Sequence, residues 1–185
     1  IEMLDLSRLE NNVQTLIEKV NVNKIINDCL GELKPLIEKK NIEVVANLDE
    51  ISLLASQSDL YKLIKNIVDN AVVYNNENGK LTINLTKNKL VISDTGVGIS
   101  KDDLEHIFER FYRVDKARSR ESSGTGLGLS IVKHICILYG YKISVESQVG
   151  KGTTFIIKFK LNISSPIKSC FINTFKTSET RICTL

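Results

Sequence analysis

Residues 122–135 read SSGTGLGLSIVKHI, with glycine at every second position from Gly124 to Gly128. An apolar pattern of helical period begins within one residue of the last glycine and includes Leu127 and Ile131. Glycine costs about 0.5–1 kcal/mol relative to alanine inside a helix, so three of them at a helix start suggest a use. The commonest use is to bring backbone amides close to an anion. The stretch predicts a phosphate-binding turn; taken alone, it also fits a tight loop with a glycine cap.

Two familiar glycine-rich signatures do not fit this stretch. A dinucleotide-binding GxGxxG would need its third glycine at Leu129 or Ile131, and no strand leads directly into it. A P-loop needs Gly-Lys followed by Ser or Thr, which neither Gly79-Lys80 nor Gly150-Lys151 provides. The HRD and DFG signatures of eukaryotic-type protein kinases are also missing. The fold must therefore be inferred from the remaining sequence.

Length and composition indicate one globular domain. The chain has 185 residues, 42% of them hydrophobic, and a net charge of +3 from interspersed charges, so no basic footprint predicts nucleic-acid binding. No apolar run approaches the roughly 18 residues of a spanning helix, and the first residues show no signal-peptide pattern, so we expect this fragment to be soluble. The cysteines lack CxxC spacing, which favours reduced, cytosolic thiols. They are Cys29, Cys136, Cys170 and Cys183.

Hydrophobic periodicity outlines the order of elements. The predicted helices are 22–39 with a kink at Pro35, 58–71, a short one from 101 to Arg110, and one from the glycines to about Gly140. The predicted strands are 42–48, 81–86, 89–93, 142–147 and 153–161, with a further strand or extended link before residue 58. This order predicts an α/β (α+β) two-layer sandwich: a mixed, mostly antiparallel sheet of about five strands, covered on one face by about three helices.

Two more patterns suggest chemistry. Asp94 begins DTGVGI at the end of a strand, where it is either a turn-capping residue or a carboxylate aimed at the exocyclic amine of a purine. Asn66 and Asn70 lie four residues apart on one helix, at the margin of its apolar stripe. They are either solvated amides or oxygen ligands suited to Mg²⁺.

These patterns occur together with FERFYRVD (108–115), GTGLGLS (124–130) and VGKGTTF (149–155). In this order the chain resembles the catalytic and ATP-binding domain of two-component sensor histidine kinases, with their N, G1, F and G2 boxes and the last glycine box. The resemblance spans about residues 14–160 and implies the Bergerat ATP-binding fold. We therefore expect the catalytic domain at 14–161, the end of a dimerisation helix at 1–13 (LDLSRLE), and a disordered or loosely packed tail at 162–185.

The resemblance implies roles for individual residues. Asp94 would accept from the adenine amino group and Tyr74 would pack beside the base. Asn66, Asn70 and Arg113 would be catalytic, with Asn70 as the Mg²⁺ ligand. Residues 113–124 would form the ATP lid, with Arg118 or Arg120 supplementing Arg113. The full set of implied nucleotide-binding residues is Asn66, Asn70, Tyr74, Asp94, Gly96, Gly98, Ile99, Tyr112, Arg113, Gly124, Thr125, Gly126, Leu127, Gly128, Leu129 and Thr153.

Two departures from the family pattern qualify this assignment. Val73 stands where NAxKY usually has lysine, so one phosphate contact is missing or supplied elsewhere, and Ser123 stands where a further glycine is frequent. Neither His106 nor His134 has the surroundings of the family's phosphoacceptor, so we expect both to be structural.

The implied function is that of a protein histidine kinase. The domain would bind ATP with Mg²⁺ and transfer the γ-phosphoryl group to a histidine on the absent dimerisation domain, for relay to an aspartate of a response regulator. The fragment would be a cytoplasmic monomer, and the full protein a homodimer anchored in the cell membrane. Hydrolytic relatives carry a glutamate base where Asn66 stands, and an amide cannot take a proton at neutral pH. A hydrolytic ATPase and a non-catalytic nucleotide sensor, the latter supported by Val73, are the alternatives.

Overall fold

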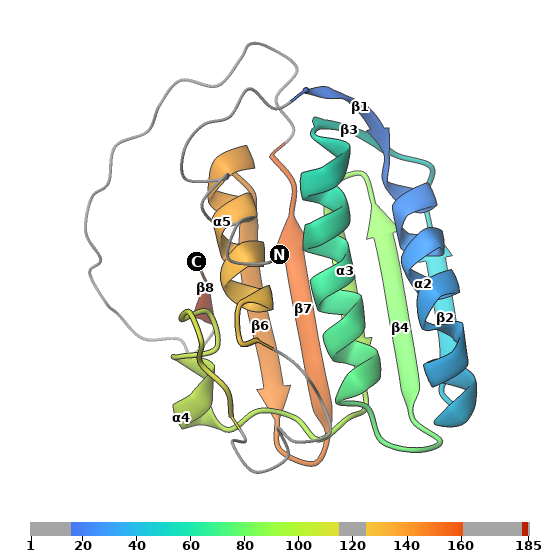
Figure 1. The fold of residues 1–185 in the computed structure, drawn as a ribbon, viewed down its shortest axis with the longest axis vertical. Coiled ribbons are helices and arrows are strands. Elements are labelled where there is room, and N and C mark those ends of the chain that lie inside the picture. The colour runs from blue at the N-terminus through green and yellow to red at the C-terminus, as the bar shows by residue number, and fades with distance from the viewer. Residues whose placement is uncertain (1–15, 115–124, 161–182, 185) are drawn as a thin grey trace.

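The structure, a computed structural model, describes residues 16–114, 125–160 and 183–184. Three helices cover one face of a sheet: α2 (Val22–Lys39), α3 (Gln57–Val73) and α5 (Gly128–Tyr139), with α3 in the middle (Figure 1). This arrangement confirms the predicted two-layer sandwich. Pro35 lies inside α2 and does not end it.

The main sheet has the strand order β2-β4-β5-β7-β6-β8. β2 pairs with β4 in parallel, and every other neighbouring pair is antiparallel. The strands are β2 (Glu43–Leu48), β4 (Lys80–Thr86), β5 (Lys89–Asp94), β6 (Lys142–Gln148), β7 (Gly152–Lys158) and β8 (Cys183–Thr184). The five longer strands are those expected from the alternating sequence, although β7 ends at Lys158, three residues before the predicted end.

Two features differ from the sequence prediction or were missed by it. β1 (Glu18–Asn21) pairs with β3 (Ser52–Ala55) in a separate two-stranded sheet, of which only the second strand had been suggested. The two residues of β8 pair with β6 at the sheet edge, in the region predicted as a tail without elements. The rest of residues 161–185, and residues 1–15, lie outside the described residues.

The short helix before residue 110 is shorter than predicted. α4 covers only Lys101–Leu104, and its N-cap Ser100 accepts from the Asp103 amide at 3.1 Å. Beyond it the backbone forms turns closed by a hydrogen bond between residues three positions apart, such as Glu109 N to His106 O at 2.8 Å. Phe111 then has a φ of 63°, which ends any helical path.

The core lies between the helices and the inner face of the sheet. The apolar stripe of α3 predicted from its period is buried, with each side chain at most 1% exposed. These residues are Leu60, Leu63, Ile64, Ile67, Val68 and Ala71. Burying one Leu or Ile side chain contributes about 1.5–3 kcal/mol, so this helix anchors the sandwich.

The two cysteines with described side chains, Cys29 and Cys136, are free and buried. Burial raises the pKa of both thiols to about 12, so they stay protonated and act as small apolar core groups. Among the described residues, no helix combines the length and apolarity needed to cross a membrane.

Candidate functional site

A row of polar side chains crosses one end of the inner sheet face. Thr153 on β7 is the register partner of Ser147 on β6, and Asp94 continues β5 from Ser93, the partner of Thr154. Asp94 therefore lies opposite Thr153, and partners across a sheet share a face. The next row on this face is wholly apolar: Ile83, Ile92, Phe155 and Val145. Asp94, Thr153 and Ser147 thus form a polar margin to an apolar core.

Asp94 is held by two backbone amides. Its Oδ1 accepts from the Gly96 amide at 2.8 Å and from the Thr153 amide at 3.2 Å. Burial raises the pKa of this carboxyl, and the two hydrogen bonds oppose that shift. Among the described residues, no hydrogen bond reaches Oδ2. The carboxylate is therefore fixed in orientation with one oxygen available to a ligand.

The turn after Asp94 interlocks with the β6–β7 turn. Gly150 N donates to Val97 O at 2.8 Å, and Ile99 N donates to Ser147 Oγ at 2.8 Å. A side chain on Gly98 would overlap the Gln148 carbonyl oxygen. These contacts bring DTGVGI and VGKGTTF together, so Asp94, Gly98, Ile99 and Thr153 lie in one region. Ser147 was not predicted, because its role depends on a residue 48 positions away.

Asn66 and the glycine stretch also meet. The Asn66 Nδ2 donates to Lys62 O at 2.7 Å, one turn earlier in α3. Its Oδ1 lies against Gly128, where a Cβ atom would overlap it. Asn70 follows one turn later and is half-buried. The structure thus brings the amide oxygen of Asn66 to the first residue of α5.

The N-terminus of α5 has no side-chain cap from a described residue. Its N-cap is Leu127, whose side chain is buried in the core and whose amide donates to Thr125 Oγ1 at 3.3 Å. The first amides of a helix need acceptors, and an anion can supply them. This end of α5 is therefore suited to a phosphate group. Leu129 lies in the first turn, and Gly124 lies outside the described residues.

A backbone hydrogen bond joins FERFYRVD (108–115) to the glycine stretch (124–130), across the segment that lies between them. Phe111 N donates to Gly126 O at 2.9 Å, and a Cβ on Gly126, which has a φ of +74°, would lie 2.9 Å from the Phe111 backbone. Within this segment, residues 115–124 lie outside the described residues, including the predicted contacts Arg118 and Arg120 and the departure at Ser123.

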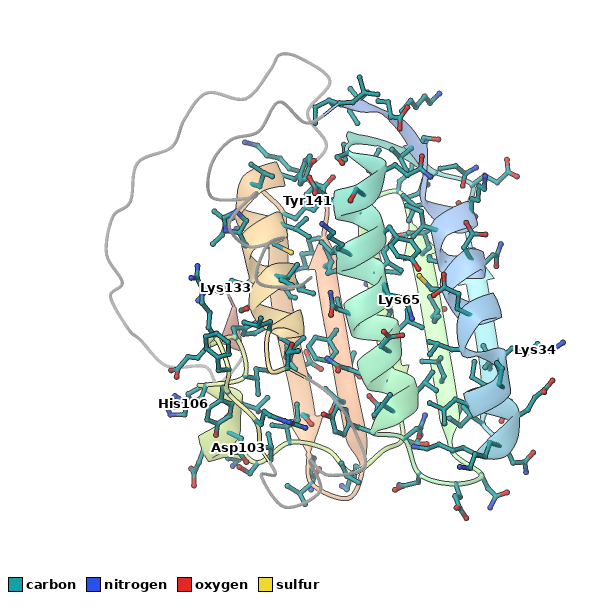
Figure 2. All side chains as sticks on the ribbon, in the orientation of Figure 1. Lys34, Lys65, Asp103, His106, Lys133 and Tyr141 are labelled. Carbon is teal, nitrogen blue, oxygen red and sulfur yellow. The ribbon has the colours of Figure 1, made fainter. Side chains whose placement is uncertain are left out.

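Tyr112 is tied to the turn around α4. Its hydroxyl donates to Asp103 Oδ1 at 2.6 Å, and its ring lies 5.4 Å from that of His106. His106 Nδ1 lies 2.7 Å from Glu109 Oε1, and this hydrogen bond raises the pKa of the imidazole. Figure 2 shows Asp103 and His106 close together beside α4. Arg113, the next residue, is half-buried. The geometry gives Tyr112 a role in holding this turn, in addition to the predicted ligand contact.

Hydrogen bonds from DTGVGI and from Lys40, at the end of α2, hold the turn after α3. Tyr74 O accepts from Val97 N at 3.1 Å, which joins this turn to DTGVGI, while the Tyr74 side chain is 48% exposed. The Lys40 ammonium donates to Val73 O at 2.5 Å and to Asn75 O at 3.0 Å. Burial lowers the pKa of Lys40. The sequence offers no local signal for this contact, because it joins residues 33 to 35 positions apart.

We predict that Lys40→Met lowers the free energy of unfolding by about 3 kcal/mol, because each of these two hydrogen bonds from a charged donor contributes about 1.5–3 kcal/mol. Urea denaturation of the parent and the variant measures the change. Lys39→Met, at the exposed neighbouring position, is the matched control and should unfold close to the parent. Equal midpoints for both variants would show that Lys40 does not stabilise the turn.

Known proteins with similar sequences are sensor histidine kinases. Residues 55–163 match the family described as histidine kinase-, DNA gyrase B- and HSP90-like ATPase. The chain is 37% identical over 175 residues to the sensor histidine kinase RppB of Synechocystis sp., covering 90% of this chain and 38% of RppB. It is 38% identical over 164 residues to the signal transduction histidine-protein kinase ArlS of Staphylococcus haemolyticus, covering 86% of this chain and 36% of ArlS.

Solved structures give the same result. The mycobacterial sensor histidine kinase MprB superposes with a TM-score of 0.67 at 25% identity, covering 78% of this chain and 97% of the other. The catalytic domain of histidine kinase ThkA superposes with a TM-score of 0.67 at 26% identity, covering 78% of this chain and 95% of the other. The chain spans only 38% and 36% of the lengths of RppB and ArlS.

The family match covers more than half of the chain and includes the polar row, the asparagine helix and the glycine stretch. The sequence relatives are sensor histidine kinases, and the structural relatives just named include a catalytic domain of such a kinase. The chain therefore belongs to the histidine kinase-, DNA gyrase B- and HSP90-like ATPase family, as a catalytic domain of the sensor histidine kinase type.

Proposed function

We propose that this domain binds Mg-ATP and, within the complete protein, transfers the γ-phosphoryl group to a histidine. The histidine would lie on a dimerisation domain ahead of the catalytic domain at 14–161, with residues 1–13 as its end. The phosphoryl group would then pass to an aspartate of a response regulator. The observation that carries the proposal is Asp94, whose Oδ1 is saturated by two amides while Oδ2 is left for a ligand.

The base would bind at the polar row. A carboxylate accepts hydrogen bonds and donates none when ionised, so Asp94 suits the amino group of adenine. Gly96, Gly98 and Ile99 belong to the turn that holds Asp94, and the half-exposed Tyr74 ring would pack beside the base. The base would therefore lie between the sheet margin and the turn after α3.

The phosphates would bind between α3 and the start of α5. Here the Asn66 oxygen meets Gly128, and the N-cap of α5 has no side-chain hydrogen bond from a described residue. Arg113 would supply positive charge to the terminal phosphates. Val73 has no positive charge. The backbone amides of α5 would therefore contribute more to phosphate binding than they do in relatives with lysine at position 73.

The donor set fits Mg²⁺ held mainly by the nucleotide. Amide oxygens are hard ligands, and Asn66 presents its oxygen because its Nδ2 is bonded to Lys62 O. Within the described parts of the chain, no group of three or more His, Cys, Asp or Glu could hold a metal ion. Asn70 would be the protein ligand, and phosphates and water would complete the coordination. The ion would neutralise charge that develops on the transferring phosphoryl group.

The chain's own part in the reaction is positioning. A neutral imidazole already has a free lone pair, so its attack needs no general base, and the amide of Asn66 cannot act as one. Asp94 fixes the base, while the α5 amides, Asn66 and Arg113 fix the phosphates and stabilise their charge. These groups favour transfer to an incoming histidine over hydrolysis.

The complete protein would have further parts. We propose that it is a homodimer anchored in the cell membrane, with this domain on the cytoplasmic side. This rests on the relatives, which are sensor kinases more than twice as long as the matched region.

We expect calorimetric titration with ATP to show one site, with removal of Mg²⁺ by EDTA weakening the affinity at least about tenfold, or about 1.4 kcal/mol. Incubation with γ-labelled ATP should leave this chain unlabelled and should label a supplied dimerisation domain that carries the phosphoacceptor histidine. Stable label on this chain alone, or steady phosphate release without acceptor, would contradict the proposal.

A further inference from the structure

The Asn75 side chain is a buried amide in the turn after α3. It is only 5% exposed. Its Nδ2 donates to Lys80 O at 3.1 Å, while its Oδ1 accepts from the Asn76 amide at 3.0 Å and from the Thr95 hydroxyl at 3.3 Å. A Cβ atom on Gly79 would overlap this oxygen, so backbone covers the amide as well. Asn75 thus joins its own turn to the start of β4 and to the end of β5.

The partners of Asn75 determine which way its amide faces. The Asn76 N–H can only donate, so the side-chain oxygen faces it, and Lys80 O can only accept, so the NH₂ group faces that. The Lys80 amide donates to Thr95 Oγ1 at 2.8 Å, which leaves the Thr95 hydrogen for Asn75 Oδ1. An apolar side chain at position 75 could replace none of these bonds.

Thr95 is held almost entirely by this segment. Its hydroxyl bonds Asn75 and Lys80, its carbonyl oxygen accepts from Asn76 Nδ2 at 2.8 Å, and its amide donates to Lys80 O at 3.1 Å. Thr95 is otherwise exposed to solvent. Without Asn75, its hydroxyl could turn toward water, and this end of β5 would lose a fixed contact with a buried group.

The residues after Thr95 connect it to the carboxylate of the site. The Gly96 amide donates to Asp94 Oδ1 at 2.8 Å, and a Cβ atom on Gly96 would overlap Tyr74 O. The next amide, Val97 N, donates to that same Tyr74 oxygen at 3.1 Å. The turn after α3 therefore contacts three consecutive residues beyond Asp94, and the middle one orients the carboxylate.

We propose that Asn75 is a positioning residue for nucleotide binding: through Thr95 it holds the Gly96 amide and the Asp94 carboxylate in place for the base. The inference rests on the nucleotide-binding function proposed above. The polar atoms of the Asn75 side chain are used by the protein, so its effect on the nucleotide is indirect. The phosphates would bind at other contacts, near Asn66 and α5, so the effect belongs to binding and not to the transfer step.

The test replaces the amide by an apolar side chain of similar shape, in Asn75→Leu. We expect calorimetry, at a temperature where the variant is fully folded, to show about a tenfold weaker affinity for Mg-ATP. In phosphoryl transfer to a supplied dimerisation domain, the KM for ATP should rise about as much while kcat stays unchanged. This split is expected when a lost contact contributes equally to the bound substrate and to the transition state.

A second route to the same link keeps the test independent of how Asn75→Leu folds. Thr95→Val removes the hydroxyl and keeps the branched shape, so it should also weaken Mg-ATP, whereas Thr95→Ser keeps the hydroxyl and should bind like the parent. In the Asp94→Asn background, Asn75→Leu should change the affinity by less than about threefold, because the carboxylate that it positions is gone.

Asn23 provides the matched control. Its side-chain amide also bonds two backbone groups, accepting from Ile51 N at 3.2 Å and donating to Leu48 O at 3.4 Å. It lies at the start of α2, at the other end of the sandwich from the turn after α3 (Figure 1). Asn23→Leu should therefore lower the midpoint of unfolding and leave both the affinity and the KM for ATP unchanged.

Three results would overturn the inference. They are parent-like ATP affinity in both Asn75→Leu and Thr95→Val, an equal loss of affinity in Asn23→Leu, and full additivity of Asn75→Leu with Asp94→Asn. A parent domain that does not bind ATP would instead refute the proposed function, and the inference with it.

Discussion

Replacing Asp94 by asparagine should weaken the affinity for Mg-ATP about a hundredfold and leave the fold intact. The new side chain must still accept from the Gly96 and Thr153 amides through its oxygen, which Asp94 does at 2.8 and 3.2 Å. Its NH₂ group then occupies the position of Oδ2 and points hydrogens at the amino group of the base. Losing a charge-assisted hydrogen bond and opposing two donors costs about 2.7 kcal/mol, which is a hundredfold in affinity.

Calorimetry measures this affinity, and thermal unfolding checks the fold. Asp102→Asn is the matched control: it removes the same charge from an exposed position in α4 and should bind like the parent. Asp94→Ala is less selective, because it leaves two amides without their acceptor and should also cost about 1–3 kcal/mol of stability. Unchanged ATP affinity in Asp94→Asn would place the base elsewhere and remove the basis of the proposed function.

Elements set by local pattern could be predicted from the sequence. The period of α3 predicts its buried face, and α5 ends where predicted, at Gly140 with a φ of 66°. The β4–β5 and β6–β7 hairpins are predicted by the alternation of apolar and polar residues on either side of a short turn. The meeting of Asp94 with Thr153 could be expected only through the family resemblance, because the contact joins residues 59 positions apart.

Features that depend on long-range contacts were missed. Lys40 fixes the turn after α3 from another helix, and Ser147 joins two turns that are distant in the chain. α4 is shorter than its apolar pattern predicted: it ends at Leu104, and further along the chain Phe111 bonds Gly126 O, a contact with no local signature. β1 and β3 are short edge elements whose sequences carry little alternation. Periodicity describes one element at a time, whereas these features arise from how the elements pack.

Gly152→Ala should lower the free energy of unfolding by about 4 kcal/mol, the largest stability effect we predict for a single methyl group here. Gly152 has a φ of +111°, and a Cβ atom there would overlap the carbonyl oxygen of Asp94 and lie 2.8 Å from Thr95 Cα. Those atoms are backbone, so relief requires β5 and β7 to separate at the polar row. The variant should also lose its affinity for ATP, because separating the strands displaces Asp94 together with β5.

The same turn supplies the matched control. Gly150 also has a positive φ, +79°, but a Cβ atom there would meet nothing within 4 Å. Gly150→Ala should lower the free energy of unfolding by only about 1 kcal/mol, the cost of placing alanine in a left-handed backbone conformation. The difference of about 3 kcal/mol between the two variants, measured from urea midpoints at equal m-values, isolates the contact with Asp94. If both variants lost the same stability and Gly152→Ala still bound ATP, the strands would have room to adjust, and the close fit around Asp94 would not be what holds the carboxylate in place.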